Sequence, residues 1–382
     1  MKGSVIRRGK KSWRLKFDLG RDPLTGKRRT TYQTFRGTKR EAETKLAELI
    51  TAAENGVYVT PDRLTLGDYL RAWLEAPVSL SPKTVERYRQ LSEQQIIPHL
   101  GGVALQKLTP AHVQEWHAKL LASGGKDGRP LSARTVGHAH RVLHRALARA
   151  VEGQKVFRNV VSIVKPPKVE EKEIQILTAG QIADVIEKLR EHPIHPIVVV
   201  ALGTGLRRGE LLALQWADVD LGAASLQVER SVEETKGGLR FKSPKSKHGR
   251  RSVSLPPIVV ETLRDLRRRQ LEVRLSLGLG KLPDEALVFS QADGSPMSPN
   301  NLSRDWRRLV ISRKFPRVSF HGLRHSHVSA LIDGGLDVFS VSRRIGHGSA
   351  ALTLGTYTHV FSKKDTEAAD TIEAALRTRA ER

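Results

Sequence analysis

The segment KPPKVEEKEIQ at residues 165–175 restricts the possible folds of this chain more than any other feature. It combines two prolines with a run of mixed charge and little apolar content, which is typical of a linker between domains. With 382 residues, the chain is long for one domain and sufficient for two or three. We therefore expect separate domains before and after this segment.

Residues 1–60 predict a small sheet followed by one helix. In WRLKFD, at residues 13–18, apolar and charged side chains alternate as in a strand with one buried face. The turn-forming stretch DPLTG leads into a second strand, and a helix is expected from about Thr38 to Asn55, ended by Gly56. Basic residues on the open sheet face suit contact with a DNA groove, and a solvated edge hairpin is the alternative. The candidate contacts are Arg14, Lys16, Arg28 and Arg29.

Residues 61–165 predict an all-helical domain of four helices. SPKTVERYR and TPAHVQEWH each begin with a capping hydroxyl followed by a proline, a typical helix start. Arginines at helical intervals gather on one side of the fourth helix, LSARTVGHAHRVLHRALARAVEG, whose His138 and His140 we interpret as structural. The candidate DNA contacts of this domain are Lys83, Arg87, Arg134, Arg141 and Arg145.

Residues 176–382 predict a mixed, mainly helical domain around a small antiparallel sheet. PIVVVALGTGLRRGELLALQW predicts an apolar helix, a glycine-containing break and a second helix, and residues 224–256 predict three strands joined by a turn and a basic loop. Further helices are expected at 257–275, 298–313, 322–333 and about 337–346, and from about Lys364 onward. The chain as a whole is therefore expected to be a multidomain α+β protein.

Charge and composition narrow the classes of partner. A formal net charge of +25 favours a polyanion, most simply nucleic acid, although a generally basic composition is the alternative. The absence of cysteine excludes disulfides, thiolate metal sites and a cysteine nucleophile. The N-terminal MKGSVIRRGKKSW lacks the apolar region of a secretory signal, and no apolar run approaches the roughly 18–20 residues of a membrane span. We expect a cytoplasmic protein without a membrane partner.

Two basic stretches are candidate phosphate sites. In TGLRRGELLAL, Arg207 and Arg208 lie at a helix start that favours an anion, and Glu210 can orient Arg207. A surface Arg–Glu pair is the alternative. In KSPKSKHGRRSVSLP, basic side chains crowd a turn without an acid among them, and Lys247 at its tip is best placed to reach forward. A patch that only grips phosphates is the alternative there. Further candidate DNA contacts in this loop are Lys245 and Arg250.

Two C-terminal stretches add histidine, arginine and tyrosine. In HGLRHSHVSALI, His321 and Arg324 are three residues apart, so they share a helical face and can converge on one phosphate. In RRIGHGSAALTLGTYTHV, His347 follows a glycine, and Tyr357 follows ten residues later. A tyrosine in such a stretch, taken alone, is usually a packing residue. No carboxylate or cysteine joins the histidines, so we expect no metal site.

These stretches together resemble a known enzyme family. The set resembles the catalytic residues of the tyrosine recombinases, or phage integrase family: Arg207, Lys247, His321, Arg324, His347 and Tyr357. TLGDYLRAWLE, SPKTVERYR and IIPHLGGVALQKLTP look like that family's helical core-site DNA-binding domain, and residues 1–60 resemble the arm-site domain of its larger members. The resemblance implies domains at 1–60, 61–165 and 176–382. RIGH in place of LGH, Gly209 in place of Ser, and Asn159-Val160 in place of Asn-Pro are mild departures.

The resemblance also implies a reaction. Tyr357 would attack a DNA phosphodiester, giving a 3′-phosphotyrosyl link and a free 5′-hydroxyl. His321 would accept the phenol proton, and Lys247 would protonate the leaving oxygen. The groups expected to hold the phosphate are Arg207, Arg324 and His347, supported by Glu210. No metal, ATP or other cofactor is expected, because the cationic groups replace a metal ion and the covalent link conserves the energy of the phosphodiester.

The implied function is site-specific recombination that integrates and excises a phage or other mobile element. The expected assembly is a homotetramer on double-stranded DNA with core and arm sites, associated with the nucleoid of a bacterial host. An excisionase or a DNA-bending protein is a possible accessory partner, and the C-terminal helix either closes its own domain or docks on a neighbouring protomer. The alternatives are a conjugative-transposon integrase, a type IB topoisomerase-like enzyme that relaxes DNA, and a DNA-binding protein without catalysis.

Overall fold

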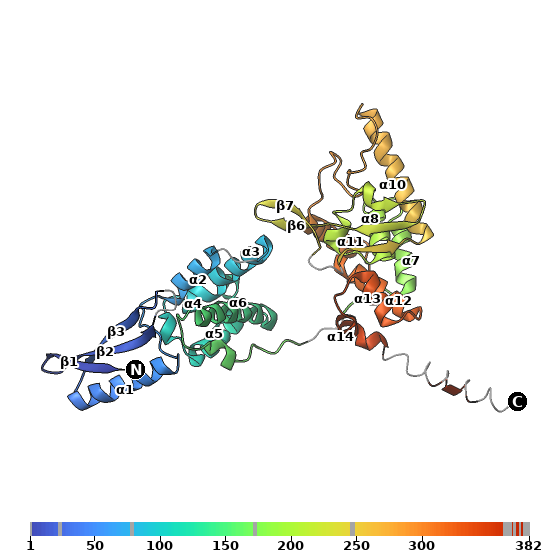
Figure 1. The fold of residues 1–382 in the computed structure, drawn as a ribbon. Helices are drawn as coiled ribbons and strands as arrows, with labels where there is room; N and C mark the ends of the chain where they lie inside the picture. Colours follow the sequence, from blue (N-terminus) through green and yellow to red (C-terminus); the bar gives the residue numbers. More distant parts are fainter. Residues whose placement is uncertain are drawn as a thin grey trace. The chain divides into compact units, whose positions relative to one another are not determined.

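The computed structural model consists of two compact units, Met1–Glu170 and Glu171–Arg382 (Figure 1). The described residues are 2–21, 25–76, 80–170, 174–244 and 249–361, with Ala369, Ile372, Glu373 and Leu376. The boundary between the units falls inside the expected linker, whose described residues form neither helix nor strand. Lys245 and Lys247 lie outside the described residues, as does most of the helix expected from about Lys364.

The first unit begins with an antiparallel sheet, in the order β1-β2-β3, and one helix. Their bounds are β1 (Gly3–Gly9), β2 (Ser12–Arg21), β3 (Arg28–Arg36) and α1 (Lys39–Glu54). Leu15 and Phe17 of β2 are fully buried in one hydrophobic cluster with Leu46 of α1, so the helix covers one face of the sheet. Thr38 and Glu41 form a capping box that starts α1. The predicted alternation and helix are confirmed, and β1 adds a strand to the predicted hairpin.

The rest of this unit is helical, as predicted. The helices are α2 (Leu66–Glu75), α3 (Pro82–Leu91), α4 (Ile97–Leu100), α5 (Pro110–Ser123) and α6 (Ala133–Glu152). A π-helical turn, Ser92–Ile96, separates α3 from α4. Pro98 explains this break, because it has no N–H for a regular helical hydrogen bond and its ring crowds the preceding turn. Trp116, Leu143 and Leu147 are among the buried residues of a core separate from that beneath the sheet.

Two histidines pair inside the helical core. His117 of α5 and His140 of α6 are both buried, and the Nε2 atom of His117 lies 3.2 Å from the Nδ1 atom of His140. One ring donates this hydrogen bond and the other accepts it, so the accepting ring must be neutral. Burial, with the charge of His117, lowers the pKa of His140 to about 4. The structural interpretation of His140 is confirmed, whereas His138 is exposed.

This pair predicts acid sensitivity of the helical core. The folded pKa of His140 lies below the unfolded value of about 6.5, so the unfolded chain binds more protons and stability falls as pH drops from about 6.5 to 4. The expected loss is on the order of 3 kcal/mol. Hydrogen exchange of α6 amides in the full chain, measured across this pH range, reports it. His140→Gln should remove most of the pH dependence and the exposed His144→Gln should not; equal pH dependence in the two variants would contradict the assignment.

The second unit is α+β, which confirms the predicted fold class. Its strands are β4 (Val219–Asp220), β5 (Ser225–Val228), β6 (Ser231–Thr235), β7 (Gly238–Lys242) and β8 (Arg251–Ser254). They form an antiparallel sheet, β4-β5-β8, and a separate β6-β7 hairpin. Its first three helices are α7 (Ala179–Lys188), α8 (His195–Thr204) and the short α9 (Arg208–Leu211). The later helices are α10 (Pro257–Ser276), α11 (Pro299–Ser312), α12 (Phe320–Asp333), α13 (Val338–Ile345) and α14 (Ala350–Phe361).

Helix α8 forms the centre of this unit. Its residues from Pro196 to Leu202 are all buried, and the helix contacts α7, α10 and α12. The apolar run that predicted a core helix therefore lies where expected. Helix α14, which carries Tyr357, was not predicted from the sequence. Within the described residues, no helix combines the length and apolar character needed to cross a membrane.

Candidate active site

A left-handed turn at Gly205 separates α8 from the arginine-bearing α9. Gly205 has a φ of 65°, and a Cβ atom on it would lie 2.5 Å from Cδ2 of His327. Only glycine therefore fits this turn without strain. The turn places Arg207 at the N-cap of α9 and points the Gly205 carbonyl at Arg324 of α12.

Arg324 is held deep in the unit. It is 3% exposed, and its Nη1 and Nη2 atoms donate to the carbonyl oxygens of Gly205, at 2.6 Å, and Ile345, at 2.7 Å. Burial and the neighbouring charge of Arg207 lower its pKa to about 9, so it remains cationic at neutral pH. The two carbonyls fix the direction of the guanidinium.

Arg207 approaches the same turn from another helix. Its Nη2 atom donates to the carbonyl oxygen of Gly346 at 2.8 Å, one residue beyond the carbonyl that Arg324 contacts. Two guanidinium groups from different segments thus converge on the Ile345–Gly346 turn, directly before His347. The predicted proximity of Arg207, Arg324 and His347 is therefore present in the structure.

Glu210 joins Arg207 to a second arginine, Arg251 of β8. Its Oε1 atom accepts from Nη1 of Arg207 at 2.7 Å, and its Oε2 atom accepts from Nη2 of Arg251 at 2.9 Å. Glu210 is 4% exposed and the Arg251 side chain 6%. Burial alone raises the pKa of Glu210, but the hydrogen bond and charge of Arg251, with the charge of Arg207, together lower it below its ordinary value.

Replacing Glu210 should destabilise the second unit strongly. Glu210→Gln removes the negative charge that pairs with both Arg207 and Arg251. Breaking a buried ion pair typically costs about 3–5 kcal/mol. Urea unfolding of the full chain measures the change. Glu187→Gln, which breaks an exposed pair with Arg190, is the matched control and should change stability by less than about 1 kcal/mol. A loss in Glu210→Gln as small as that in the control would show that the buried network contributes little to stability.

Tyr357 lies in α14 at a break in the helix. Its φ and ψ of −121° and 20° depart from helical values. The ring is 1% exposed and packs with Val328, Ile332 and Val341. Its hydroxyl lies 2.6 Å from Nδ1 of His325. Burial raises the pKa of Tyr357 to about 12, against the opposing charge of Arg324. The phenol is therefore protonated at neutral pH, and its charged state is accessible only with help from a neighbour.

His321 and His347 flank this cluster as neutral rings. Burial, followed by the charges of His325 and Arg324, lowers the pKa of His321 to about 4, although the side chain retains access to solvent. Burial, followed by the charges of Arg324 and Arg207, lowers that of His347 to about 4. Nδ1 of His347 lies 2.8 Å from the hydroxyl of the buried Thr353. Among the described residues, no hydrogen-bond partner of its Nε2 atom is found, so this nitrogen can contact a ligand.

A small groove borders His347. It has a volume of about 330 Å³ and is lined by Arg250, Arg251, Phe339, Arg343, Gly346 and His347. Arg250 is exposed at the rim of this groove and pairs with Glu229 at 3.3 Å. Its predicted contact with DNA would therefore be made at this rim. No acidic side chain lines the groove among the described residues. The surface is suited to a phosphate.

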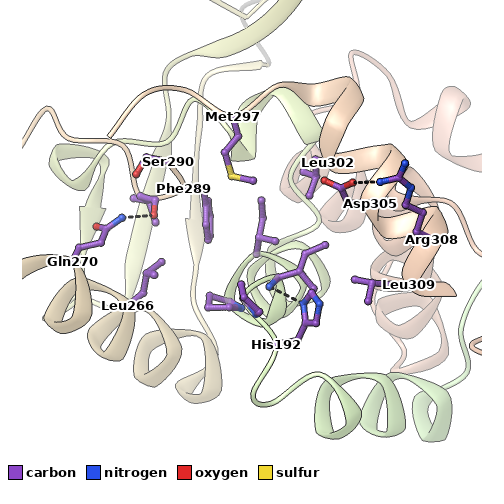
Figure 2. Close-up of a pocket in the computed structure, with 15 residues that line it drawn as sticks. His192, Leu266, Gln270, Phe289, Ser290, Met297, Leu302, Asp305, Arg308 and Leu309 are labelled. Carbon is purple, nitrogen blue, oxygen red and sulfur yellow. Dashed lines mark hydrogen bonds and ion pairs between the residues drawn. The ribbon is translucent and has the colours of Figure 1, made fainter. Parts of the chain in front are cut away.

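Another cavity of the second unit has a different character. It has a volume of about 480 Å³, lies between α8, α10 and α11, and is mainly apolar (Figure 2). Leu266, Phe289, Met297 and Leu309 are among its lining residues, and the residues around Tyr357 are not. Within the described part of the chain, no group of three or more His, Asp and Glu side chains is placed to hold a metal ion.

Several site residues were missed from the sequence. His325, which contacts the phenol, was noted in HGLRHSHVSALI without a role. Arg251 was one of several basic residues in a loop, and nothing in the sequence distinguished it. His327 and Arg344 form a supporting layer: His327 donates from Nδ1 to the Leu202 carbonyl at 2.7 Å, and its Nε2 accepts from Nε of Arg344 at 3.2 Å. Their pairing depends on the approach of α13 to α12, which spacing does not predict.

The candidate DNA contacts of the first unit lie on two surfaces. Arg14 and Lys16 share the sheet face opposite α1, where the guanidinium of Arg14 stacks 4.1 Å above the ring of Tyr32. Arg28 and Arg29 are exposed at the start of β3, and Arg28 pairs with Asp18 at 3.4 Å.

The second surface of this unit joins α3 and α6. The charges of Arg141, Arg87 and Arg134 all act on His138 and, after burial, lower its pKa, so these arginines lie close together. Arg145 donates to the hydroxyl of Tyr88 at 3.4 Å. The last candidate, Lys83, is exposed and pairs with Glu86 at 3.3 Å. The structure thus brings the candidates of two helices onto one basic face.

Comparisons with known proteins show which family has this sequence and fold. Residues 175–364 match the model of the phage integrase family, and residues 65–121 match that of the phage integrase N-terminal SAM-like domain. A tyrosine recombinase XerC-like protein of Caldanaerobacter subterraneus subsp. tengcongensis is 30% identical over 97% of this chain and 98% of its own.

Solved structures share the fold. The Tn1549 transposon integrase in complex with a circular intermediate DNA aligns with a TM-score of 0.65 and 20% identity, covering 77% of this chain and 95% of that one. A lambda integrase tetramer bound to a Holliday junction aligns with a TM-score of 0.56 and 18% identity, covering 91% and 93%. Because the XerC-like relative matches along almost the whole of both chains, this protein belongs to the phage integrase family of tyrosine recombinases, site-specific recombinases that cleave and rejoin DNA.

Proposed function

We propose that this chain carries out its strand exchange with Tyr357 as nucleophile and a cationic pocket made of Arg207, Arg324 and His347. The observation that carries the proposal is the convergence of the two guanidinium groups on the Ile345–Gly346 turn, beside the phenol-bearing helix. Charge develops on the non-bridging oxygens of the phosphate during attack, and donors fixed in advance stabilise it best. Both arginines are fixed in this way, by carbonyl oxygens and, for Arg207, by Glu210.

The reaction proceeds by an exchange of phosphoester bonds. The Tyr357 oxygen attacks phosphorus and loses its proton, the bond to the 5′-oxygen breaks, and a 3′-phosphotyrosyl link forms. Lys247, on resemblance, gives a proton to the leaving oxygen, and His321, which is exposed, is available to contact the phosphate. Because Tyr357 is 1% exposed, the residues that cover the phenol must move on DNA before phosphorus reaches it. The break in the helix at Tyr357 lets the part of α14 beyond it move while the phenol keeps its contact with His325.

DNA binding is divided among three surfaces. The α3–α6 face and the groove beside His347 bind the core site, and the open face of the β1-β2-β3 sheet binds a separate arm site. Stacking on Tyr32 holds the guanidinium of Arg14 ready to contact DNA. Arg14→Ala should therefore weaken binding to arm DNA in a band-shift assay and leave core-site binding unchanged. Equal weakening at both sites would refute this division.

The assembly follows from the same proposal. The lambda integrase structure holds a tetramer on a Holliday junction, and we infer a homotetramer here. In the C-terminal segment, Ile372 is 60% exposed and Leu376 68%, so these apolar side chains are free to contact a neighbouring protomer. The DNA that the enzyme integrates and excises is that of a phage or an integrative element. An excisionase or a DNA-bending protein assists excision.

A nicked suicide substrate tests the proposed chemistry. Such a DNA carries a core site with a nick near the cleavage position, so the short 5′-hydroxyl fragment diffuses away and cleavage cannot be reversed. The chain should then appear on a denaturing gel as a covalent protein–DNA adduct in the presence of a metal chelator. Failure to form this adduct on DNA that the chain binds would overturn the proposal.

A further inference from the structure

The hydroxyl of Tyr357 has a specific partner. Within the described part of the chain, the phenol shares its hydrogen bond with Nδ1 of His325, at 2.6 Å, and the two ring centroids are 5.6 Å apart. His321, the base expected from resemblance, lies one turn earlier on α12 and contacts His325 edge to face, with centroids 5.0 Å apart. The ring nearest to the reacting oxygen is therefore that of His325.

His325 is in a state that can accept a proton. It is half-buried, and the groups around it are His321 and Arg324 on α12, Tyr357 on α14, and His347 after α13. None of these is a carboxylate that would stabilise a protonated imidazole. Burial, followed by the charge of Arg324, lowers the pKa of His325 below its ordinary value, so the ring is neutral at pH 7. With the proton on Nε2, the Nδ1 lone pair faces the phenol hydroxyl.

The phenol needs such an acceptor. With a pKa of about 12, Tyr357 is ionised in only roughly one molecule in 10⁵ at pH 7. A nucleophile of this kind depends on a base within hydrogen-bonding distance of its proton. In this structure His325 meets that condition.

We propose that His325, and not His321, is the general base for Tyr357. This inference rests on the proposed function of Tyr357 as nucleophile. The proton passes from Oη to Nδ1 of His325 as the bond from Oη to phosphorus forms. The bond from phosphorus to the 5′-oxygen breaks, and that oxygen takes its proton from the general acid, so charge and protons balance. His321 remains on the phosphate side of the pocket.

Two substitutions of His325 separate proton transfer from positioning. His325→Asn retains an oxygen that can accept the phenol hydrogen bond near the position of Nδ1, but this oxygen does not take up the proton. His325→Ala removes both functions. The adduct rate on the suicide substrate should fall about 10²–10⁴-fold in both variants at pH 7. If His325 only positions the ring, His325→Asn should keep nearly the full rate, which would overturn the proposal.

The pH dependence of the rate gives a second readout. The wild-type rate should fall as pH drops through the lowered pKa of His325, because the protonated ring has no lone pair for the phenol. In His325→Asn the rate should instead rise about tenfold per pH unit through neutrality, following ionisation of the phenol itself. An unchanged profile in this variant would contradict the inference.

A fluorinated tyrosine at position 357 completes the test. Ring fluorination lowers the pKa of a phenol, so the rate of attack depends less on a general base. It should restore much of the lost rate in His325→Ala and little in His321→Ala, because His321 acts at the phosphate. Preferential rescue of His321→Ala would assign the base to His321 instead. Adduct formation by the wild-type chain holds in either case, so the inference can fail while the proposed function stands.

Discussion

Replacing Tyr357 with phenylalanine should abolish covalent adduct formation while the protein stays folded and bound to DNA. The substitution removes one oxygen, and without it no bond to phosphorus can form. Loss of a catalytic nucleophile typically lowers the rate by about 10⁴–10⁶-fold. The ring itself keeps its packing against Val328, Ile332 and Val341, and the lost hydrogen bond to His325 changes stability by only about 1 kcal/mol. Denaturing gels with the nicked substrate measure the adduct, and band shifts measure DNA binding.

Tyr69 offers a matched control for this substitution. Its hydroxyl donates to the carbonyl oxygen of Ala146 at 3.0 Å, in the first unit, and it is also partly buried. Tyr69→Phe therefore loses a comparable hydrogen bond at a position without a proposed chemical role. It should form adduct at close to the wild-type rate. If Tyr357→Phe still formed adduct, another residue would be the nucleophile, and the assignment to Tyr357 would be wrong.

The catalytic candidates that sequence analysis found share a local signal. His321 and Arg324 were identified because a spacing of three places them on one helical face, and Glu210 because it lies three residues after Arg207. These relations stay within one helix or one helix start, and the structure preserves them. Local spacing is thus sufficient where both partners belong to a single element.

The contacts that organise the site cross between elements, so spacing did not predict them. Arg251 reaches Glu210 across 41 residues of sequence, and Arg207 reaches the Gly346 carbonyl across 139. His325 meets Tyr357 only because α14 packs on α12. The sequence of α14, AALTLGTYTHVF, contains three threonines and Gly355, which are poor helix formers, and it lacks the regular apolar stripe that predicts a helix.

The fold shows the same division between local and distant causes. The start of helix α5 was predicted to the residue, because Thr109 and Pro110 are strong local start signals. Gly209 was noted as a departure from the family, and only the three-dimensional structure explains it. A Cβ atom there would lie 2.6 Å from both the Ser231 hydroxyl and the Val232 carbonyl of β6. The close approach of the β6-β7 hairpin to α9 therefore leaves no room for serine in this chain.

Removing the guanidinium of Arg207 should slow cleavage by about 10²–10³-fold on ordinary DNA. Arg207 is the better arginine to replace, because its side chain is 39% exposed, whereas Arg324 is deeply buried and bonded to two carbonyls. A substrate with a methylphosphonate at the cleavage position has lost the negative charge that the guanidinium is proposed to stabilise. On that substrate, Arg207→Ala should slow cleavage far less.

The ratio of the two rates distinguishes charge stabilisation from structure. A variant that merely distorts the pocket slows both substrates alike, whereas loss of a phosphate-neutralising group slows only the charged one. Arg208→Ala is the matched control. The Arg208 guanidinium donates to the hydroxyl of Ser303 and has no proposed contact with the phosphate. Its rate ratio should match that of the wild type. Should Arg207→Ala show the wild-type ratio as well, Arg207 would be a structural partner of Glu210, and stabilisation of the phosphate would have to come from Arg324 and His347.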